Sequence, residues 1–344
     1  MARLLSLPGV QRLRWVVRRV APKALILLYH RVSAPDADPQ LLCVTPEHFS
    51  EHLQILRRYY HPMRLLDLQK RLQLNLWPHR SVVLTFDDGY ADNFHQARPL
   101  LEAQGIPATV FVASDGVDTQ QEFWWDALER IFLSSPTLPA NLIIQLGGKE
   151  LTWKLDDASP SQSQPSWNVL AEISPTARQQ AYLDWMKLMR GLDVETRQAI
   201  LSHLAAWAGV DLTHGRQDYL PVKADELRSL PKDGWIEVGA HTVNHPSLSA
   251  LSLQAQQDEI LAGKTALEKI LDRSVRSFAY PFGERRDYTV DTAKLVQQAG
   301  FACACSNFTG HVTVLSDPCQ LPRFIVRNWD GDTFAQQLEE WFRD

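Results

Sequence analysis

The chain has 344 residues, which is enough for one large domain or two small ones with a sizeable core. Apolar residues make up 45% and charged residues 22%, values typical of a globular protein and unlike those of a disordered chain. The net charge of −5, from 35 basic and 40 acidic residues, argues against nucleic acid as a partner. The four cysteines show neither a zinc pattern nor the density of a disulfide scaffold, so they indicate buried thiols in a reducing compartment.

The first 31 residues contain seven basic residues and no acidic one. An apolar stripe at helical spacing between residues 10 and 20 predicts a basic amphipathic helix over residues 1–23. Packing over one end of the fold is the favoured interpretation, and peripheral contact with an anionic membrane surface is the alternative. Because arginines interrupt the segment, it lacks the apolar region of a secretory signal. We therefore expect a cytoplasmic location, with the inner face of the membrane as the alternative.

Short apolar runs and amphipathic segments alternate along most of the chain. Strands are predicted over residues 24–30, 81–84, 107–113, 235–240, 275–280, 301–305 and 324–326, with another near 63–66. Helices are predicted over residues 46–60, 92–104, 253–271, 289–298 and 333–342. Repeated strand–helix units imply a parallel sheet with right-handed crossovers. We therefore expect an α/β fold, an irregular (β/α) barrel of about seven strands, over residues 24–344.

Residues 115–231 break this alternation. Helices are predicted over residues 124–133, 174–189 and 194–208, a hairpin around Gly147-Gly148, and a loop over 157–166. These elements predict a mainly helical subdomain inserted beside one face of the barrel.

Two aspartates, Asp87 and Asp88, follow the strand that begins at residue 81. Neighbouring side chains of a strand point to opposite faces, so the two carboxylates can serve one site only where the backbone turns. Gly89 permits that turn. The alternative is that Asp87, Asp88 and Gly89 only form a turn that caps the N-terminus of a helix. Adjacent carboxylates repel each other unless a cation or hydrogen-bond donors neutralise them, which makes this strand end a candidate site.

Two histidines four residues apart, His241 and His245, follow the strand over 235–240. Pro246 disfavours helix at His245, so we expect a loop. Structural histidines are the simplest explanation for the pair taken alone. Combined with a carboxylate at a neighbouring strand end, the pair suits zinc with an open position for water. His30 and the turn Tyr280-Pro281-Phe282-Gly283 also follow predicted strands, at the barrel end where active sites lie.

At this point the sequence resembles the polysaccharide deacetylase family, the metal-dependent carbohydrate esterases of family 4. Thr85-Phe86-Asp87-Asp88-Gly89 and His241-Thr242-x-x-His245 are similar to its first two motifs, and Pro281-Phe282-Gly283 to the core of the third. The resemblance covers residues 24–113 and 232–326 and leaves the insertion out.

The resemblance implies a division of roles between the residues. Asp88, His241 and His245 would hold a divalent metal, expected to be Zn²⁺, with Co²⁺, Ni²⁺ or Mn²⁺ as alternatives. Asp87 would be the base that takes a proton from the attacking water. The metal and the backbone N–H of Phe282, within the turn Tyr280-Pro281-Phe282-Gly283, would stabilise the oxyanion.

The chain departs from the family's pattern in two places. The third motif usually begins with an arginine that orients the catalytic aspartate, and Ala279 stands there instead. Arg323, before a late strand, is expected to reach Asp87 in its place, and a surface ion pair is the alternative. The late Leu-x-His motif that supplies the general acid is missing. His30 is the leading candidate for that role, with a structural role open, and His311 is the second.

Trp124-Trp125-Asp126 follows the strand over 107–113, near the same barrel end. A tryptophan here is a candidate to stack on a sugar ring, with Asp126 bonding to a hydroxyl group. The alternative is that both indoles fix the insertion to the barrel.

These observations predict a deacetylase that removes N-acetyl groups from an amino sugar in a glycan or glycan precursor. Two alternatives remain: a catalytically impaired glycan-binding barrel, and another zinc amidohydrolase acting on non-sugar amides.

Overall fold

The computed structural model describes residues 23–74, 78–155, 167–172 and 174–343. The helix predicted over residues 1–23 and the loop predicted over 157–166 therefore fall almost entirely outside the described residues. Within the described part, no helix is long and apolar enough to cross a membrane.

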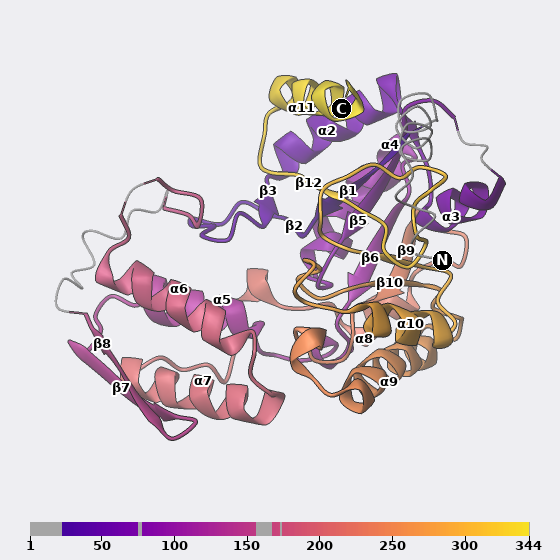
Figure 1. The fold of residues 1–344 in the computed structure, drawn as a ribbon. Helices are drawn as coiled ribbons and strands as arrows, with labels where there is room; N and C mark the ends of the chain where they lie inside the picture. Colours follow the sequence, from indigo (N-terminus) through magenta and orange to yellow (C-terminus); the bar gives the residue numbers. More distant parts are fainter. Residues whose placement is uncertain (1–22, 75–77, 156–166, 173, 344) are drawn as a thin grey trace, which may run out of the picture.

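A parallel sheet forms the centre of the molecule, and it confirms the expected α/β barrel (Figure 1). Seven strands lie in the order β11-β10-β9-β6-β5-β1-β12, and β4 is added beside β5. Every neighbouring pair is parallel. The strands are β1 (Ala24–Tyr29), β4 (His61–Pro62), β5 (Ser81–Phe86), β6 (Ala108–Val112), β9 (Ile236–Ala240), β10 (Ser277–Ala279), β11 (Cys303–Cys305) and β12 (Phe324–Ile325).

The central strands are buried on both faces because helices cover the sheet. All residues of β1 and β5 are buried, which explains their continuous apolar sequence. The covering helices are α2 (Pro46–Tyr59), α3 (Leu65–Leu74), α4 (Arg98–Gln104), α8 (Ala224–Arg228), α9 (Leu253–Leu271), α10 (Val290–Gln298) and α11 (Gly331–Arg343). A short parallel pair, β2 (Arg31–Val32) and β3 (Cys43–Val44), lies outside the main sheet.

A second group of elements lies beside the barrel, separate from its sheet in Figure 1. It contains α5 (Trp124–Glu129), α6 (Ala177–Met189), α7 (Val194–Ala208) and the antiparallel hairpin of β7 (Asn141–Leu146) and β8 (Lys149–Lys154). A distinct apolar cluster, which includes Trp125, Tyr182 and Trp185, holds these elements together. These elements fall within the predicted insertion, whose limits at 115 and 231 stay a prediction.

Several predicted boundaries differ from the structure. The strand expected near 63–66 lies slightly earlier, as β4 (His61–Pro62), because the helix α3 that follows it already begins at Leu65 and buries Leu65 and Leu68 at helical spacing. The helix expected from 174 begins at Ala177, since Thr176 is its cap and forms a capping box with Gln179. The helix expected over 124–133 continues beyond α5 as a π-helical turn.

Candidate metal and catalytic site

Side chains that follow four sheet strands meet at one cavity of about 260 Å³. His30 follows β1, Asp87 and Asp88 follow β5, His241 follows β9, and Phe282 lies three residues beyond β10. The carboxyl ends of parallel strands share one edge of the sheet, which is why residues distant in sequence come together here. Residues of the insertion form the opposite wall: Trp125 of α5, Met186 of α6 and Arg190.

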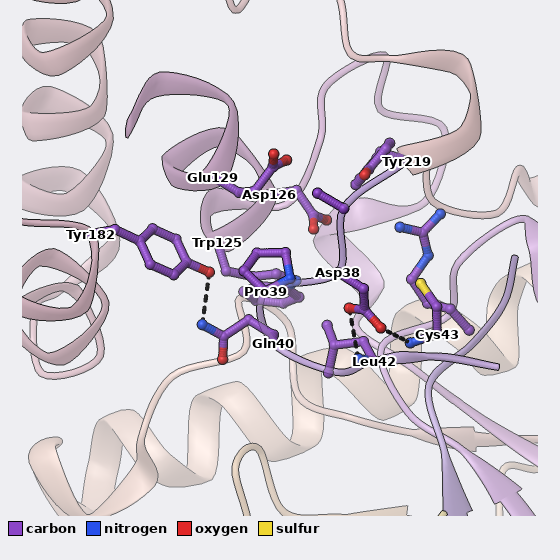
Figure 2. Close-up of a pocket in the computed structure, with 12 residues that line it drawn as sticks. Asp38, Pro39, Gln40, Leu42, Cys43, Trp125, Asp126, Glu129, Tyr182 and Tyr219 are labelled. Carbon is purple, nitrogen blue, oxygen red and sulfur yellow. Dashed lines mark hydrogen bonds between the residues drawn. The ribbon is translucent and has the colours of Figure 1, made fainter. Parts of the chain in front are cut away.

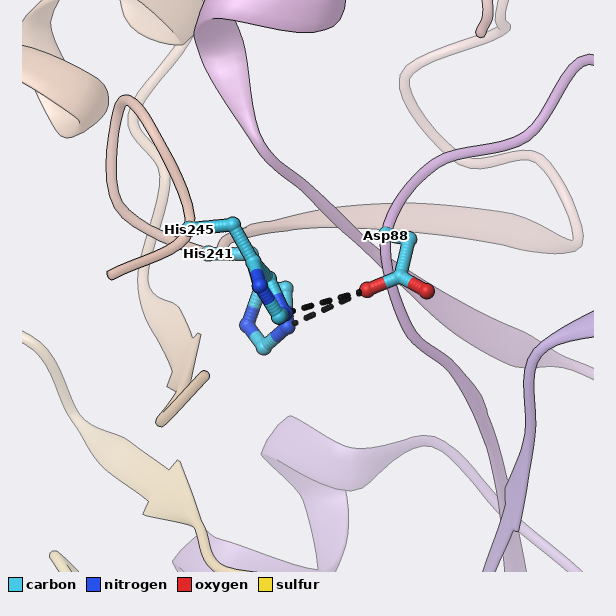
Figure 3. A group of neighbouring side chains, drawn as sticks. All are labelled: Asp88, His241 and His245. Atoms are coloured by element: carbon cyan, nitrogen blue, oxygen red, sulfur yellow. Dashed lines mark ion pairs between the residues drawn. The ribbon is translucent and has the colours of Figure 1, made fainter. Parts of the chain in front are cut away.

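Asp88, His241 and His245 form a compact group of candidate metal ligands (Figure 3). The Asp88 Oδ1 lies 3.6 Å from Nε2 of His241 and 3.3 Å from Nε2 of His245. One ligand atom from each residue lies within 4.8 Å of the others, and all three residues are buried.

The donor atoms of Asp88, His241 and His245 suit a cation. The His241 Nδ1–H donates to the carbonyl of Ala279 at 2.8 Å, which leaves the Nε2 lone pair for a metal. Burial would raise the pKa of Asp88, but the two neighbouring histidines hold it well below its usual range. Burial lowers the pKa of His245. A carboxylate oxygen and two imidazole nitrogens form a donor set that fits Zn²⁺.

Aromatic rings fix the position of His245. The centroids of the Trp125 and Phe282 rings each lie 4.7 Å from the centroid of the His245 ring. The Nδ1 atom of His245 has no hydrogen-bond partner among the described residues. Its orientation therefore depends on ring packing.

Left-handed backbone conformations are concentrated at this site. Asp88, Thr242, His245 and Phe282 have φ angles of 75°, 66°, 52° and 59°. Such angles are costly for residues other than glycine, and they persist where the surrounding structure imposes them. Gly89 follows Asp88 with a φ of 85°, and a Cβ there would lie 3.0 Å from the Val112 side chain.

Helix α9 holds the loop that carries the two histidines. The Glu259 carboxylate accepts hydrogen bonds from the backbone N–H groups of Val243 and Asn244 and from the Asn244 amide. Gly263 allows the helix to approach, because a Cβ there would lie 2.7 Å from the Thr242 carbonyl. Sequence analysis missed both Glu259 and Gly263, which show no signal beyond their place on an amphipathic helix.

Asp87 is paired with Arg323 inside the barrel. Its two carboxylate oxygens accept hydrogen bonds of 2.7 and 2.6 Å from the Arg323 guanidinium, whose Nε–H also donates to the Ser306 carbonyl. Both side chains are buried, so this is not the surface ion pair considered above. Burial would raise the pKa of Asp87, but the Arg323 charge holds it below its usual value.

His30 and His311 differ in position. His30 lines the cavity, and its ring has no hydrogen-bond partner among the described residues. Burial lowers the pKa of His30, whereas the nearby charges of Asp88 and Asp87 raise it. His311 is absent from the cavity lining, and its Nε2–H donates to the Trp341 carbonyl. Of the two candidates, His30 therefore lies at the cavity and His311 is not among its lining residues.

The turn Tyr280-Pro281-Phe282-Gly283 contributes less to the cavity than expected. Phe282 lines it, but Tyr280 and Pro281 do not. Tyr280 points into the core instead, where its hydroxyl group donates to the Cys319 carbonyl at 2.8 Å and its ring stacks on Tyr288. Its expected contact with substrate is not supported by this placement.

The Trp124-Trp125-Asp126 segment also divides, because consecutive residues of a helix point in different directions. Only Trp125 lines the site cavity. Trp124 lies over the Arg197 guanidinium, beside a neighbouring pocket. Asp126 faces a separate small cavity of about 20 Å³ (Figure 2). It accepts a hydrogen bond from the Tyr90 hydroxyl at 2.7 Å. Burial raises its pKa to about 8. Asp126 does not line the site cavity and bonds to Tyr90, so this placement does not support the expected contact with a sugar hydroxyl.

The cavity-lining residues that sequence analysis did not identify include Gln40, Arg190, Asn307 and Arg327. Arg327 follows β12 by two residues. The strand-end rule used above would have found it, whereas the other three have no comparable signal.

Residues 77–135 and 198–304 match the family model described as polysaccharide deacetylase, and both matched segments carry site residues named above. These residues are therefore similar to a polysaccharide deacetylase domain. The Bacillus subtilis (strain 168) protein YxkH, itself named only provisionally as a polysaccharide deacetylase, is 24% identical over 152 residues. That alignment covers 44% of this chain and 50% of YxkH, so the chain spans about half the length of this curated relative.

Solved structures show the same fold. The deacetylase PplD of Streptococcus pyogenes, solved with acetate, is similar with a TM-score of 0.58 and 16% identity, over 93% of this chain and 99% of PplD. IcaB from Ammonifex degensii is similar with a TM-score of 0.54 and 15% identity, over 94% and 98% of the two chains. The parallel sheet is therefore the distorted (β/α) barrel of these deacetylases.

Proposed function

We propose that this chain is a metal-dependent hydrolase that removes the N-acetyl group from an amino sugar in a glycan or glycan precursor. One observation carries the proposal. The candidate ligands Asp88, His241 and His245 share a cavity with Asp87, a buried carboxylate whose oxygens both bond to Arg323. A deacetylase requires such a pair of neighbouring functions, a cation site and a base.

Asp88, His241 and His245 are the residues that would hold the metal, and the carboxylate–imidazole donor set fits Zn²⁺. When bound, the metal would supply Lewis-acid polarisation of the acetamide carbonyl and would lower the pKa of water. The donor set does not decide between Zn²⁺ and the alternatives Co²⁺, Ni²⁺ and Mn²⁺.

Asp87 would accept the proton of the attacking water. Its carboxylate lies at the cavity and is ionised, since Arg323 keeps its pKa below the usual value despite burial. The two hydrogen bonds to Arg323 also fix the rotation of the carboxylate, and such orientation contributes to general base catalysis.

Two other groups would act on the amide. The backbone N–H of Phe282 forms no hydrogen bond with another described residue and belongs to a cavity-lining residue, so it is available to the oxyanion. His30 would protonate the leaving amine, since its ring lines the cavity and is free of partners within the described chain. The amino sugar would be released with a free amine, together with acetate.

The glycan-binding alternative rested on the missing arginine and missing acid. Arg323 at Asp87 and His30 at the cavity now support the enzyme instead. Peripheral contact of residues 1–23 with a membrane stays a prediction.

The test measures acetate release from N-acetylated oligosaccharides by the zinc-loaded protein. We expect Asp87→Asn to lower kcat by about 10²–10⁴-fold while the bound metal is retained. Asp88→Asn should lose the metal as well, measured by elemental analysis. Asp225→Asn is a matched control, because the Asp225 side chain is 90% exposed and pairs only with neighbouring Arg228. If no acetate is released with Zn²⁺ or Co²⁺, the proposed function is wrong.

A further inference from the structure

An unpaired arginine, Arg327, lies at the wall of the site cavity. It lines the cavity together with His30, Asn307 and Ile325. Its Nη1–H donates to the Leu41 carbonyl at 2.6 Å, a contact that fixes the guanidinium but leaves its charge uncompensated. Among the described residues, no carboxylate forms an ion pair with it.

The other charged groups at this cavity are already paired. Arg323 is paired with Asp87. Arg190 donates two hydrogen bonds to Asp287, at 3.1 and 2.5 Å. Glu284 pairs with Arg286 at 2.8 Å. Arg327 is therefore the one cation of the described cavity lining without a carboxylate partner.

The carboxylate whose charge acts on Arg327 is that of Asp38, but this carboxylate already accepts hydrogen bonds from other groups. Both Asp38 oxygens accept backbone hydrogen bonds, from Leu42 at 2.9 Å and Cys43 at 2.8 Å, beside the small cavity of Figure 2. Burial lowers the pKa of Arg327, and Asp38 only partly opposes that effect. A partly buried guanidinium without a counter-ion is costly, and an incoming oxyanion would remove that cost.

A second polar group on the same wall lacks a partner. The side-chain oxygen of Asn307 is buried and accepts no hydrogen bond from a described residue. Arginine favours phosphate and carboxylate because its planar guanidinium can donate two parallel hydrogen bonds.

We propose that Arg327 binds an oxyanion, a phosphate or carboxylate, that the substrate carries beside its N-acetylated sugar. The inference rests on the proposed function and narrows its substrate to an anionic amino-sugar compound. The site would thus accept a sugar phosphate or an N-acetylated uronic acid in preference to a neutral N-acetylated sugar.

The experiment compares three substrates with the zinc-loaded full chain. They are methyl N-acetylglucosaminide, N-acetylglucosamine 1-phosphate, and the methyl glycoside of N-acetylglucosaminuronic acid. We expect kcat/KM for one anionic substrate to exceed that for the neutral one by about tenfold or more. Arg327→Gln should lower kcat/KM for the preferred anionic substrate by about 10–100-fold and leave kcat/KM for the neutral substrate nearly unchanged. Which anion is preferred distinguishes phosphate from carboxylate.

Equilibrium binding of the same three compounds, measured by calorimetry, separates this inference from the proposed function. Arg327→Lys should retain part of the anion preference, because it keeps the charge but loses the planar fork. Arg343→Gln removes the same charge from an exposed position on α11 and should change nothing.

Two results would overturn the inference. If Arg327→Gln weakens binding of all three compounds equally, Arg327 only shapes the cavity. Unchanged anion binding in Arg327→Gln would mean that the metal alone holds the anion. Anion binding that depends on Arg327 without any acetate release would support the inference and contradict the proposed function.

Discussion

Arg323 and Asp87 are joined by two hydrogen bonds, although 236 residues separate them in sequence. Arg323 precedes β12, which pairs with β1, and β1 pairs with β5, the strand that leads to Asp87. The guanidinium therefore reaches the aspartate across one intervening strand. It also contacts Thr85 Oγ1 at 3.3 Å. Arg323 thus makes the contact with Asp87 that we expected in place of an arginine at Ala279, and its orienting role stays a proposal.

Replacing Arg323 with glutamine should reduce both activity and stability. The Asp87 charge would be left buried and unpaired, a change that typically costs about 3–5 kcal/mol of unfolding free energy. The pKa of Asp87 would rise, because burial would then act without the opposing arginine. The acid limb of the pH–rate profile should therefore move to higher pH. Urea unfolding and kcat/KM between pH 4 and 9 measure both effects.

Arg323→Lys separates charge from geometry. A lysine keeps the positive charge near Asp87 but cannot donate two parallel hydrogen bonds from a planar group. The acid limb of the pH–rate profile should therefore shift less than with glutamine. An unchanged pH profile in both variants would contradict the orienting role.

Exchange of His30 should affect the reaction, whereas exchange of His311 should not. His30→Gln removes the proposed acid and should lower kcat by about 10²–10⁴-fold. His311→Gln alters a residue outside the described cavity lining, whose ring donates to the Trp341 carbonyl. Its kcat, measured below its own unfolding temperature, should stay near that of the unmodified chain. The opposite ranking of the two variants would assign the acid to His311.

Tyr90 links the insertion to the site through two hydrogen bonds. The Trp125 Nε1–H donates to the Tyr90 hydroxyl at 2.6 Å, and that hydroxyl donates to Asp126 at 2.7 Å. Tyr90→Phe removes both bonds and leaves two buried groups unpaired, which should cost about 1–3 kcal/mol of unfolding free energy. Because Trp125 packs against His245, metal affinity should fall as well.

Metal titration followed by tryptophan fluorescence measures the Tyr90→Phe effect. Tyr219→Phe is a suitable control, since Tyr219 lines the small cavity that Trp125 and Asp126 also line and forms no hydrogen bond with Trp125. Unaltered metal affinity in Tyr90→Phe would show that Trp125 does not position His245.

His52 should make the stability depend on pH. It is buried, its Nε2–H donates to the Trp329 carbonyl at 2.8 Å, and burial lowers its pKa from 6.5 to about 4. The folded chain therefore binds this proton less readily than the unfolded chain. Its contribution is fully present above about pH 6.5 and is lost as the pH falls toward 4, about 3 kcal/mol in all.

Urea unfolding at pH 7.0, 5.5 and 4.5 tests this prediction. His52→Gln should show a smaller loss of unfolding free energy on acidification than the unmodified chain. His203→Gln, which changes an exposed histidine of α7, should show the same loss as the unmodified chain. Equal pH dependence in all three proteins would contradict the role of His52.

Most of the fold could be predicted from local sequence. The apolar, β-branched runs of β1, β5 and β6 are buried on both faces, and helix α9 has the bounds that its periodicity predicts. The strand predicted near 63–66 lies at 61–62 instead, because a short apolar run is compatible with strand or helix, and packing against the sheet placed Leu65 in α3.

The grouping of Asp88, His241 and His245 also followed from sequence, because residues after parallel strands reach the same edge of a sheet whatever the order of the strands. Contacts across the sheet do depend on strand order and register. Only the tertiary structure placed Arg323 against Asp87, turned Asp126 away from the cavity, and left Arg327 at the cavity wall without a carboxylate. Those relationships arise from side-chain packing between distant segments, which no local pattern records.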